Sequence, residues 1–280
     1  MRRWGWLSLL SLTIVVTLLA GCGGSKQVFS TGALSSVRLT TASFSLLSAR
    51  YYSAGSPLLT LYLEGDGRAW ASRYRLSSDP TPVNPLALRL AAVDVDLNKQ
   101  QSVAWLGRAC QYQPVGGDPA CESRYWSSHR FSEKVVASMN EAVDQLMKES
   151  GAKQLRLVGF SGGGAVAVLL AARRSDVVGV VTVAGNLDHD WVNRHHGVTL
   201  LSGSLNPLVV AGQIRKVPQI HFVGGKDEVV PDEVVTRFIA MGKADLCAHK
   251  ILVRNVAHIK GWVEQWGRLL QGVDTELSCG

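Results

Sequence analysis

The sequence predicts an α/β fold in which a mostly parallel central sheet carries helices on both faces. Short apolar runs alternate along the chain with longer segments whose apolar residues recur at helical spacing, which is typical of repeated strand-helix-strand units. The 280 residues, of which 46% are hydrophobic, suffice for one sizeable core. One globular domain is therefore expected.

The order of the predicted elements supports this fold class. Apolar runs predict strands at residues 44–52, 57–63, 102–106, 155–158, 177–183, 219–223 and 251–256. Helical spacing predicts helices at residues 85–92, 131–147, 165–172, 231–241 and 262–270, and Ser132 and Glu133 suit the start of the second of these. The first two strands resemble a hairpin, so we expect them to add an antiparallel edge to the sheet.

The N-terminal residues indicate export. Arg2 and Arg3 precede an apolar run at residues 7–19, which is shorter than the roughly 20 residues that cross a bilayer. We predict a cleaved signal peptide at residues 1–21, a Gly- and Ser-rich flexible tether at 22–36 and a single domain at 37–280. An uncleaved N-terminal anchor is the alternative.

The run Leu19-Ala20-Gly21-Cys22 resembles the lipobox of bacterial lipoproteins. This resemblance implies that Cys22 becomes the mature N-terminus, carries acyl chains such as palmitate and anchors the domain to a membrane. It also implies an exported protein on the periplasmic face. In lipoproteins that stay at the inner membrane, Asp follows the cysteine. This chain has Gly23 at that position, which resembles lipoproteins that go to the outer membrane by default.

The charge pattern argues against a nucleic-acid-binding protein. Loss of Arg2 and Arg3 lowers the formal net charge from +7 to +5, and the remaining basic residues are scattered rather than gathered in a stripe. We expect a monomer without a nucleic-acid partner.

Four cysteines remain after Cys22, an even number in a compartment that permits disulfides. They allow three connectivities, of which Cys110 with Cys121 and Cys247 with Cys279 closes the shortest loops. No Cys-x-x-Cys or Cys/His cluster surrounds them, so a metal site is not predicted.

Residues 159–163 form the pattern G-x-S-x-G, with Ser161 at its centre, directly after one predicted strand and before an Ala- and Val-rich helix. This setting is typical of a nucleophile elbow, where small residues relieve crowding around a strained serine. The helix that follows directs its N-terminal amides toward the site where negative charge would develop. A Gly-rich turn with a bystander serine is the alternative.

A nucleophilic serine needs an imidazole base and a carboxylate that orients it. Asp227 lies just beyond the strand at 219–223, whereas Glu228 is its competitor, and Asp232 and Glu233 suit the first turn of the next helix. His258 lies just beyond the strand at 251–256, and His249 precedes that strand and would lie at the wrong end of the sheet. We predict Ser161, Asp227 and His258 as a catalytic triad.

These residues resemble the α/β-hydrolase superfamily, in which the chain order is also Ser, acid, His. The resemblance covers residues 43–270. It implies that the amide of Gly162 and a second amide from the loop after an early strand form an oxyanion hole. Residues 61–67 resemble the His-Gly-x-Gly loop with Glu64 in place of His, so Asp66 is the second donor, with Gly67 as the alternative. An ordinary Asp-Gly turn is the competing interpretation.

Residues 108–112, 125–131 and 203–207 resemble segments of bacterial hydrolase lipoproteins. Residues 187–218 correspond to a short cap, in which Trp191 would help to line an acyl pocket. The cap holds His189, Asp190, His195 and His196, but their spacing fits no common metal site. His129 and Trp126 border the cleft or pack beneath it.

The sequence therefore predicts a serine hydrolase that cleaves an ester-like acyl substrate, a carboxylester or thioester, through an acyl-enzyme on Ser161, without metal or organic cofactor. An acyltransferase with the same triad and a non-catalytic envelope lipoprotein on the same fold are the alternatives. The substrate, its acyl length and the membrane are not specified by the sequence.

Overall fold

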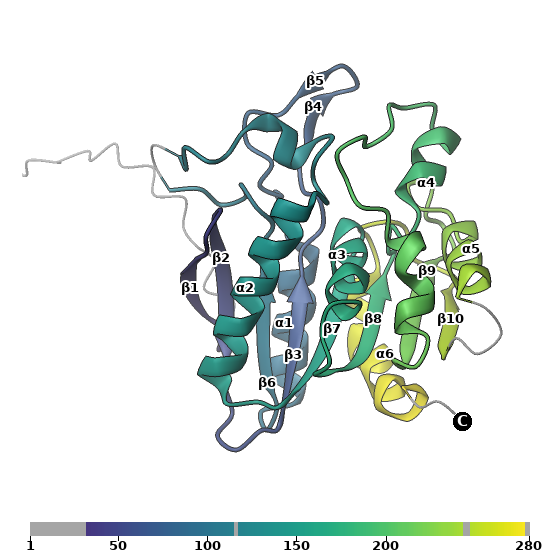
Figure 1. Ribbon diagram of the computed structural model, residues 1–280. Coiled ribbons are helices and arrows are strands. Elements are labelled where there is room, and N and C mark those ends of the chain that lie inside the picture. Colours follow the sequence, from purple (N-terminus) through teal and green to yellow (C-terminus); the bar gives the residue numbers. More distant parts are fainter. Residues whose placement is uncertain (1–31, 115–116, 243–246, 278–280) are drawn as a thin grey trace, which may run out of the picture.

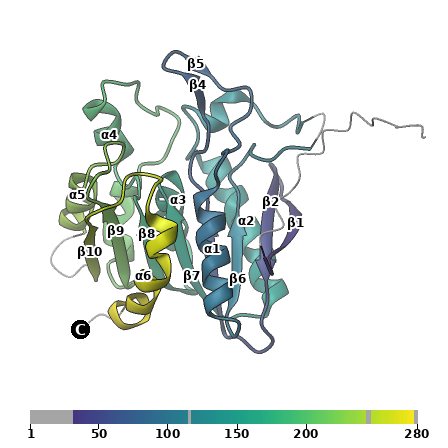
Figure 2. The same cartoon turned by 180° about the vertical axis from the view of Figure 1, so that it is seen from behind.

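A central sheet runs through the protein with helices on both of its faces (Figures 1 and 2). The computed structural model describes residues 32–114, 117–242 and 247–277. The strands are β1 (Ser35–Thr40), β2 (Ser45–Tyr51), β3 (Leu58–Leu63), β4 (Trp70–Ser72), β5 (Arg75–Leu76), β6 (Ser102–Leu106), β7 (Gln154–Phe160), β8 (Val177–Val183), β9 (Gln219–Gly224) and β10 (Ala248–Val253). The helices are α1 (Leu86–Leu97), α2 (Glu133–Ser150), α3 (Gly162–Ala171), α4 (His189–His195), α5 (Glu233–Met241) and α6 (Trp262–Glu276), with 3-10 turns η1 (Ser123–Trp126) and η2 (Pro207–Ile214).

The described residues form an eight-stranded sheet in the order β1-β2-β6-β3-β7-β8-β9-β10. From β6 to β10 all neighbouring strands are parallel, and β2 is antiparallel to both β1 and β6. The α/β fold with a mostly parallel sheet is therefore confirmed, and the sheet does have an antiparallel edge.

The partners at that edge differ from the expectation. The predicted hairpin of residues 44–52 and 57–63 does not form, because β3 pairs in parallel with β6 and β7 in the middle of the sheet. Five of the six residues of β3 are buried, as expected for a strand covered on both faces. β2 pairs instead with β1, a strand that the sequence analysis did not predict and that begins at Ser35, within the expected tether.

Two hydrophobic clusters lie on opposite faces of the sheet. One packs α2, α3 and α5 against the face seen in Figure 1, and the other packs α1 and α6 against the face seen in Figure 2. Every buried core residue of the described chain lies at or after Leu34. A chain that begins at residue 23 therefore keeps the whole described fold.

Helix α2 follows the sequence prediction closely. The Ser132 side chain accepts a hydrogen bond from the Val135 amide, which satisfies one of the free amides of the first turn. At the other end Gly151 has a φ of 72°, a left-handed conformation that favours glycine, and its amide donates to the Met147 carbonyl.

Several predicted boundaries were wrong. Helix α1 continues to Leu97 rather than ending at residue 92, and α6 continues to Glu276 rather than ending at residue 270. Helix α3 begins at Gly162, three residues before the predicted start, because its first turn consists of glycines that give no apolar signal. Strand β10 ends at Val253 rather than at residue 256. It pairs with β9 from Ala248, opposite Gln219, to Val253, opposite Gly224. Beyond Val253 the chain leaves the sheet, and the Val256 carbonyl accepts a hydrogen bond from the Lys226 amide.

The carboxyl ends of β3, β7, β8 and β9 meet at one edge of the sheet, at the top in Figure 1. The hairpin of β4 and β5 and helix α4 lie at the same edge. In open α/β sheets this edge is where ligands bind, because the loops that follow the strands converge there.

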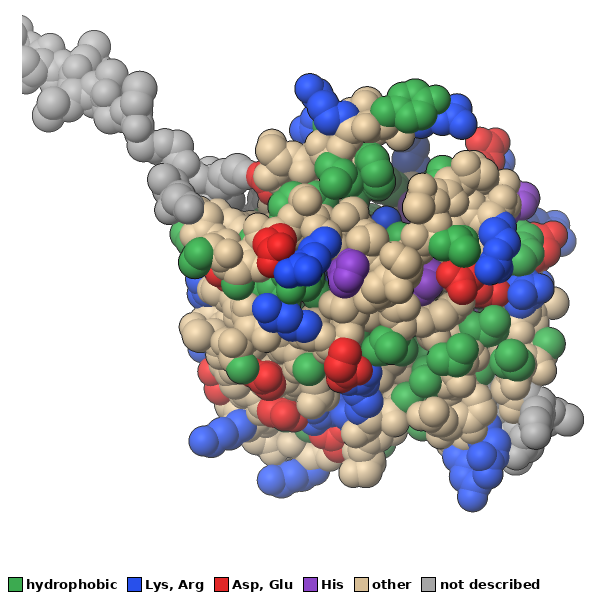
Figure 3. All heavy atoms as spheres, turned by 45° about the horizontal axis from the view of Figure 1, so that its top comes forward, with side chains coloured by type: hydrophobic (Ala, Val, Ile, Leu, Met, Phe, Trp, Pro, Cys, Tyr) green, Lys and Arg blue, Asp and Glu red, His purple; other side chains and the backbone are tan. Residues whose placement is uncertain are grey.

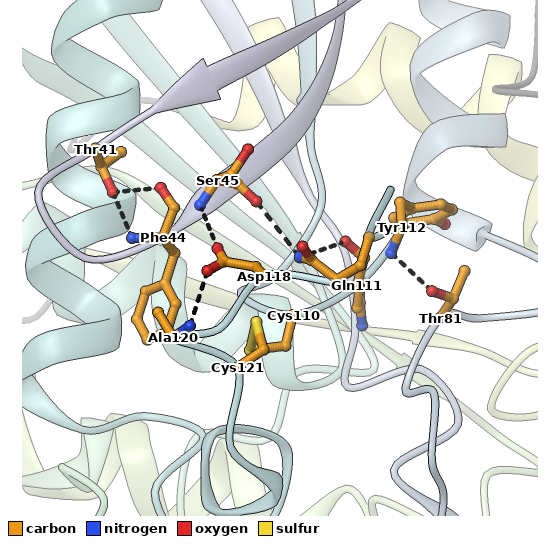
Figure 4. The surroundings of a disulfide bond; sticks show 11 residues. Thr41, Phe44, Ser45, Thr81, Cys110, Gln111, Tyr112, Asp118, Ala120 and Cys121 are labelled. Carbon is orange, nitrogen blue, oxygen red and sulfur yellow. Dashed lines mark hydrogen bonds between the residues drawn. A yellow bond between two sulfur atoms is a disulfide. The ribbon is translucent and has the colours of Figure 1, made fainter. Parts of the chain in front are cut away.

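A disulfide joins Cys110 to Cys121, as the sequence analysis favoured, with 5.4 Å between their Cα atoms (Figure 4). Asp118, inside the loop that it closes, accepts hydrogen bonds from the amides of Ser45 and Ala120. The bridge and these bonds hold the loop after β6 against β2. Cys279 lies outside the described residues, so its pairing with Cys247 stays a prediction.

The signal peptide, Cys22 and most of the tether also lie outside the described residues. In the described part of the chain, each helix is too short or too polar to span a bilayer.

Replacing Cys110 and Cys121 by Ala should lower the free energy of unfolding by about 3 kcal/mol, because the bridge closes a short loop and restricts the unfolded chain. Urea unfolding of the two proteins under non-reducing conditions measures the difference. An unchanged unfolding midpoint would show that the loop is held by its other contacts alone.

Candidate active site

Ser161 lies in the sharp turn between β7 and α3 with φ 51° and ψ −117°, a backbone conformation that is strained for any residue except glycine. The turn is held at both ends. The Ser161 amide donates to the Val183 carbonyl at 3.0 Å, and the Ser161 carbonyl accepts from the amides of Gly164 and Asn186 at 2.9 and 3.0 Å. These bonds fix the hydroxyl at the carboxyl edge of the sheet.

The glycines of the elbow are required by close backbone contacts. A Cβ atom on Gly159 would collide with the backbone of Gly163, and one on Gly163 would collide with the Leu63 carbonyl oxygen. The G-x-S-x-G pattern therefore reflects a place where α3 starts in direct contact with both β7 and the end of β3.

The structure brings the three predicted side chains together. His258 Nε2 lies 3.0 Å from Ser161 Oγ, and His258 Nδ1 lies 2.9 Å from Asp227 Oδ2. The Asp227 side chain is 1% exposed and that of His258 13%. The Asp227 carboxylate can only accept, so Nδ1–H donates a hydrogen bond to it, and Nε2 carries the lone pair that accepts the hydrogen bond from the serine hydroxyl.

Each partner is itself held in place. Asp227 Oδ1 accepts hydrogen bonds from the amides of Val229 and Val230, both at 2.9 Å, which leaves Oδ2 for the imidazole. The buried indole of Trp262 donates to the carbonyl of His258 at 3.1 Å and so fixes the loop that carries the imidazole. The sequence analysis did not predict this role of Trp262. The available indication was its position at the start of the helix that follows His258.

The competing residues lie elsewhere. Glu228 is exposed and Asp232 pairs with Lys250 at 2.8 Å, and within the described part of the chain the acidic partner of His258 is Asp227. His249 lies in β10, paired with Ile220, at the amino end of the strand, as expected for a residue outside the site.

The loop after β3 packs against the start of α3. A Cβ atom on Gly162 would collide with the Asp66 carboxylate, so these two residues are immediate neighbours. Among the described residues, the amides of Gly162, Asp66 and Gly67 have no hydrogen-bond acceptor. The predicted oxyanion donors are thus close together and unpaired, and the choice between Asp66 and Gly67 stays open.

Glu64, which stands where the resemblance to the His-Gly-x-Gly loop would place a histidine, is buried. Its carboxylate accepts hydrogen bonds from the Trp105 indole at 2.9 Å and from the amides of Ala87 and Leu88 at 3.3 Å, and also from the Gly65 amide. Burial raises the pKa of the Glu64 carboxyl above its ordinary value. The residue therefore ties the oxyanion loop to the N-terminus of α1, where a carboxylate is favoured.

The Asp66 side chain forms an ion-pair network that the sequence analysis did not foresee. Its two oxygens accept hydrogen bonds from Arg108 at 3.0 Å and Arg130 at 2.8 Å. The Arg108 guanidinium also lies over the Phe131 ring and donates to the Arg130 carbonyl. Burial alone would raise the pKa of Asp66, but the two guanidiniums outweigh it and hold that pKa below its ordinary value.

This network has an electrostatic consequence for the site. An unpaired carboxylate beside the Gly162 amide would repel a developing oxyanion, whereas the group of Asp66, Arg108 and Arg130 carries a net charge of +1. Arg108 and Arg130 occur in the two segments, 108–112 and 125–131, that carried the resemblance to hydrolase lipoproteins. The sequence analysis singled out the segments that contain the two arginines, but it did not predict that both arginines pair with Asp66.

The cap segment, residues 187–218, contains α4 and η2. Asp188 caps α4 and also pairs with Arg237 of α5 at 3.0 Å. His189 is buried against the Phe131 ring, and burial lowers the pKa of its imidazole. Trp191 stacks on His195, with 4.8 Å between the ring centroids. This contact does not test its role in an acyl pocket, which stays a prediction.

The histidines of the cap have separate partners rather than a common one. His189 Nε2 lies 3.2 Å from the Leu205 carbonyl oxygen, and His196 Nε2 lies 2.9 Å from that of Val229. Within the described ranges, no group of three or more His, Cys, Asp or Glu side chains could hold a metal ion. His129 contacts the cap at Gly203, and Trp126 donates to the Ser77 carbonyl at 3.1 Å.

The fold and the site together define a serine hydrolase of the α/β-hydrolase class. Residues 84–259, more than half of the chain, match the family described as Serine hydrolase (FSH1). The chain belongs to this family of serine hydrolases. A comparison with curated protein sequences found no match.

Several solved structures share the fold. An esterase from Pyrococcus furiosus has a TM-score of 0.61 at 15% identity, over 88% of this chain and 91% of its own. Est1E from Butyrivibrio proteoclasticus has a TM-score of 0.58 at 13% identity, over 86% and 98%. An α/β serine hydrolase without a lid from Xanthomonas campestris has a TM-score of 0.55 at 14% identity, over 88% and 96%.

Replacing Asp66 by Asn should destabilise the protein at neutral pH by about 3 kcal/mol, because the buried Arg108 and the partly buried Arg130 lose their counter-charge while one acceptor remains. The pKa of Asp66 is below its ordinary value of 3.8, so the stabilisation is complete above that pH and is lost as the pH falls through the lower, folded-state value. The difference between the two proteins in urea unfolding should therefore close below about pH 4.

Asp232→Asn is the matched control, since its pair with Lys250 is exposed and contributes less than about 1 kcal/mol. Equal effects of the two substitutions would contradict a special role for the Asp66 network.

Proposed function

We propose that this chain is a serine esterase, with Ser161 as nucleophile, His258 as general base and Asp227 as the residue that orients the imidazole. The observation that carries the proposal is the continuous pair of hydrogen bonds from Ser161 Oγ through the imidazole to the buried carboxylate. That arrangement is what a serine hydroxyl needs in order to attack a carbonyl at neutral pH.

The reaction has two steps. Ser161 Oγ attacks the acyl carbonyl as its proton passes to His258 Nε2, and the imidazolium that forms is stabilised by Asp227. The C–O bond to the leaving alcohol breaks as Nε2 returns the proton to it, which leaves the acyl group on Ser161. Water then gives a proton to Nε2 and attacks the acyl-enzyme, and the carboxylic acid departs as Ser161 regains its hydroxyl proton.

The negative charge of each tetrahedral intermediate falls beside the amides of Gly162 and of Asp66 or Gly67. One such donor is worth about 10²- to 10³-fold in rate when it is fixed in advance. The contact between Gly162 and Asp66 and the net positive charge of the arginine network support this assignment.

We also propose that the mature protein is a lipoprotein anchored through Cys22 on the periplasmic face of a membrane, and of the outer membrane in a Gram-negative cell. The support is the resemblance of residues 19–22 to a lipobox, together with Gly23.

A fluorophosphonate probe should label the chain that begins at residue 23, and Ser161→Ala should abolish the labelling and lower the rate of ester hydrolysis by about 10⁴- to 10⁶-fold. Gel fluorescence and intact mass report the labelling, and Ser128→Ala, which removes a different hydroxyl, is the control. Full labelling of the Ser161→Ala protein would rule the assignment out.

The cap is short, and one solved structure of the same fold is described as lacking a lid. We therefore expect the esterase to prefer short and medium acyl chains, because a long chain needs a larger apolar surface to cover it. Hydrolysis of p-nitrophenyl acetate, butyrate, octanoate and palmitate, compared by kcat/KM, tests this. A maximum at palmitate would contradict it.

A further inference from the structure

The hairpin of β4 and β5 carries a solvent-exposed group of aromatic and basic side chains that the catalytic site does not use. We define this tip as Arg68, Trp70, Arg73, Tyr74 and Arg75. Trp70 is 48% exposed and Tyr74 86%, although most of the other large rings of the described chain are buried. Arg73 and Tyr74 form the turn between the two strands, so they project furthest.

The three arginines of the tip have no acidic partner among the described residues. From Gly67 to Ser78 the sequence contains no Asp or Glu, so the tip carries a local charge of +3. Other arginines of the protein, such as Arg50, Arg124, Arg173 and Arg174, form ion pairs. An unpaired positive cluster next to exposed rings is suited to a partner that is both anionic and apolar.

The hairpin is fixed where it leaves the domain, at Arg68 and Ser77, and its turn at Arg73 and Tyr74 extends away from these contacts. Arg68 donates its amide to the Pro80 carbonyl, and the Ser77 amide donates to the Ala69 carbonyl. The Trp126 indole donates to the Ser77 carbonyl, and Ala69 and Ser77 are buried. A two-stranded ribbon is only marginally stable alone, so these contacts hold the tip in a defined direction.

The hairpin lies at the carboxyl edge of the sheet, the edge that holds Ser161 (Figure 1). Figure 3, in which that edge is turned forward, shows basic and hydrophobic side chains projecting together above a hollow in the surface. A surface that the tip contacts would therefore face the catalytic end of the protein.

We propose that the tip docks the domain on an anionic lipid surface, with Trp70 and Tyr74 at the level of the headgroups and the arginines on lipid phosphates. Trp and Tyr are favoured at this depth because one part of each ring is apolar and another donates a hydrogen bond. The guanidinium fork matches phosphate oxygens. This proposal does not depend on the catalytic role of Ser161.

The length of the chain outside the fold is compatible with such docking. Twelve residues separate Cys22 from Ser35, and an extended chain of that length spans about 40 Å. A domain anchored at Cys22 would remain close enough to the membrane for a weak docking surface to act at high effective concentration.

Vesicle binding by the chain that begins at residue 23 tests the proposal without the lipid anchor. Sedimentation is measured with vesicles of phosphatidylcholine alone and with vesicles that contain phosphatidylglycerol in addition. We expect binding to the anionic vesicles that weakens with added salt, and much weaker binding to the neutral ones. Arg73→Gln combined with Arg75→Gln should weaken binding about 25-fold, or about fivefold for each charge.

Lys153→Gln combined with Arg268→Gln is the matched control. Both residues are exposed and lie away from the hairpin, and the two substitutions remove the same net charge as those in the tip. It should leave binding almost unchanged. Trp70→Ser combined with Tyr74→Ser should weaken binding to the anionic vesicles as well. All variants should keep the circular dichroism spectrum, the melting temperature and the rate with p-nitrophenyl acetate.

Three results would overturn the proposal. The first is no binding to anionic vesicles, or binding to a single-stranded oligonucleotide instead. The second is equal loss of binding in the tip and control variants, which would reflect net charge alone. The third is loss of p-nitrophenyl acetate hydrolysis in the folded tip variants, which would make the hairpin a wall of the substrate site.

Discussion

The site depends on one backbone contact, between the first turn of α3 and the loop that follows β3. Gly162 and Gly163 lack side chains at the two positions where a Cβ atom would strike the Asp66 carboxylate or the Leu63 carbonyl. This approach brings the amide of Gly162 next to the loop that carries the other proposed oxyanion donor, the amide of Asp66 or Gly67. The strained φ of Ser161 results from the same tight turn.

Other features of this end of the protein can be understood as support for that contact. Glu64 connects the loop to the N-terminus of α1 through hydrogen bonds from two of its amides. Arg108 and Arg130 hold the Asp66 carboxylate through ion pairs. Arg108 lies two residues after the end of β6 and two residues before Cys110, where the loop closed by the disulfide begins. The loop geometry is therefore maintained by charge pairs and a covalent bridge rather than by packing of apolar side chains, which are scarce between residues 64 and 67.

The sequence was sufficient to predict the fold class, the elbow and the juxtaposition of Ser161, Asp227 and His258, because each of the three follows a strand whose apolar run is visible locally. It was not sufficient for β1, whose alternation is short, or for the end of β10, which is set by pairing with β9. The ion pairs of Asp66 join residues 42 and 64 positions apart, and no local pattern marks them. The sequence therefore did not predict these long-range polar contacts.

A crystal structure of the chain that has reacted with a fluorophosphonate tests the central claim most directly, because the phosphonyl oxygen occupies the position of the developing oxyanion. The account predicts phosphorus bonded to Ser161 Oγ and the phosphonyl oxygen within hydrogen-bonding distance of the amides of Gly162 and of Asp66 or Gly67. A phosphonyl oxygen directed into solvent, or an adduct on another residue, would contradict it.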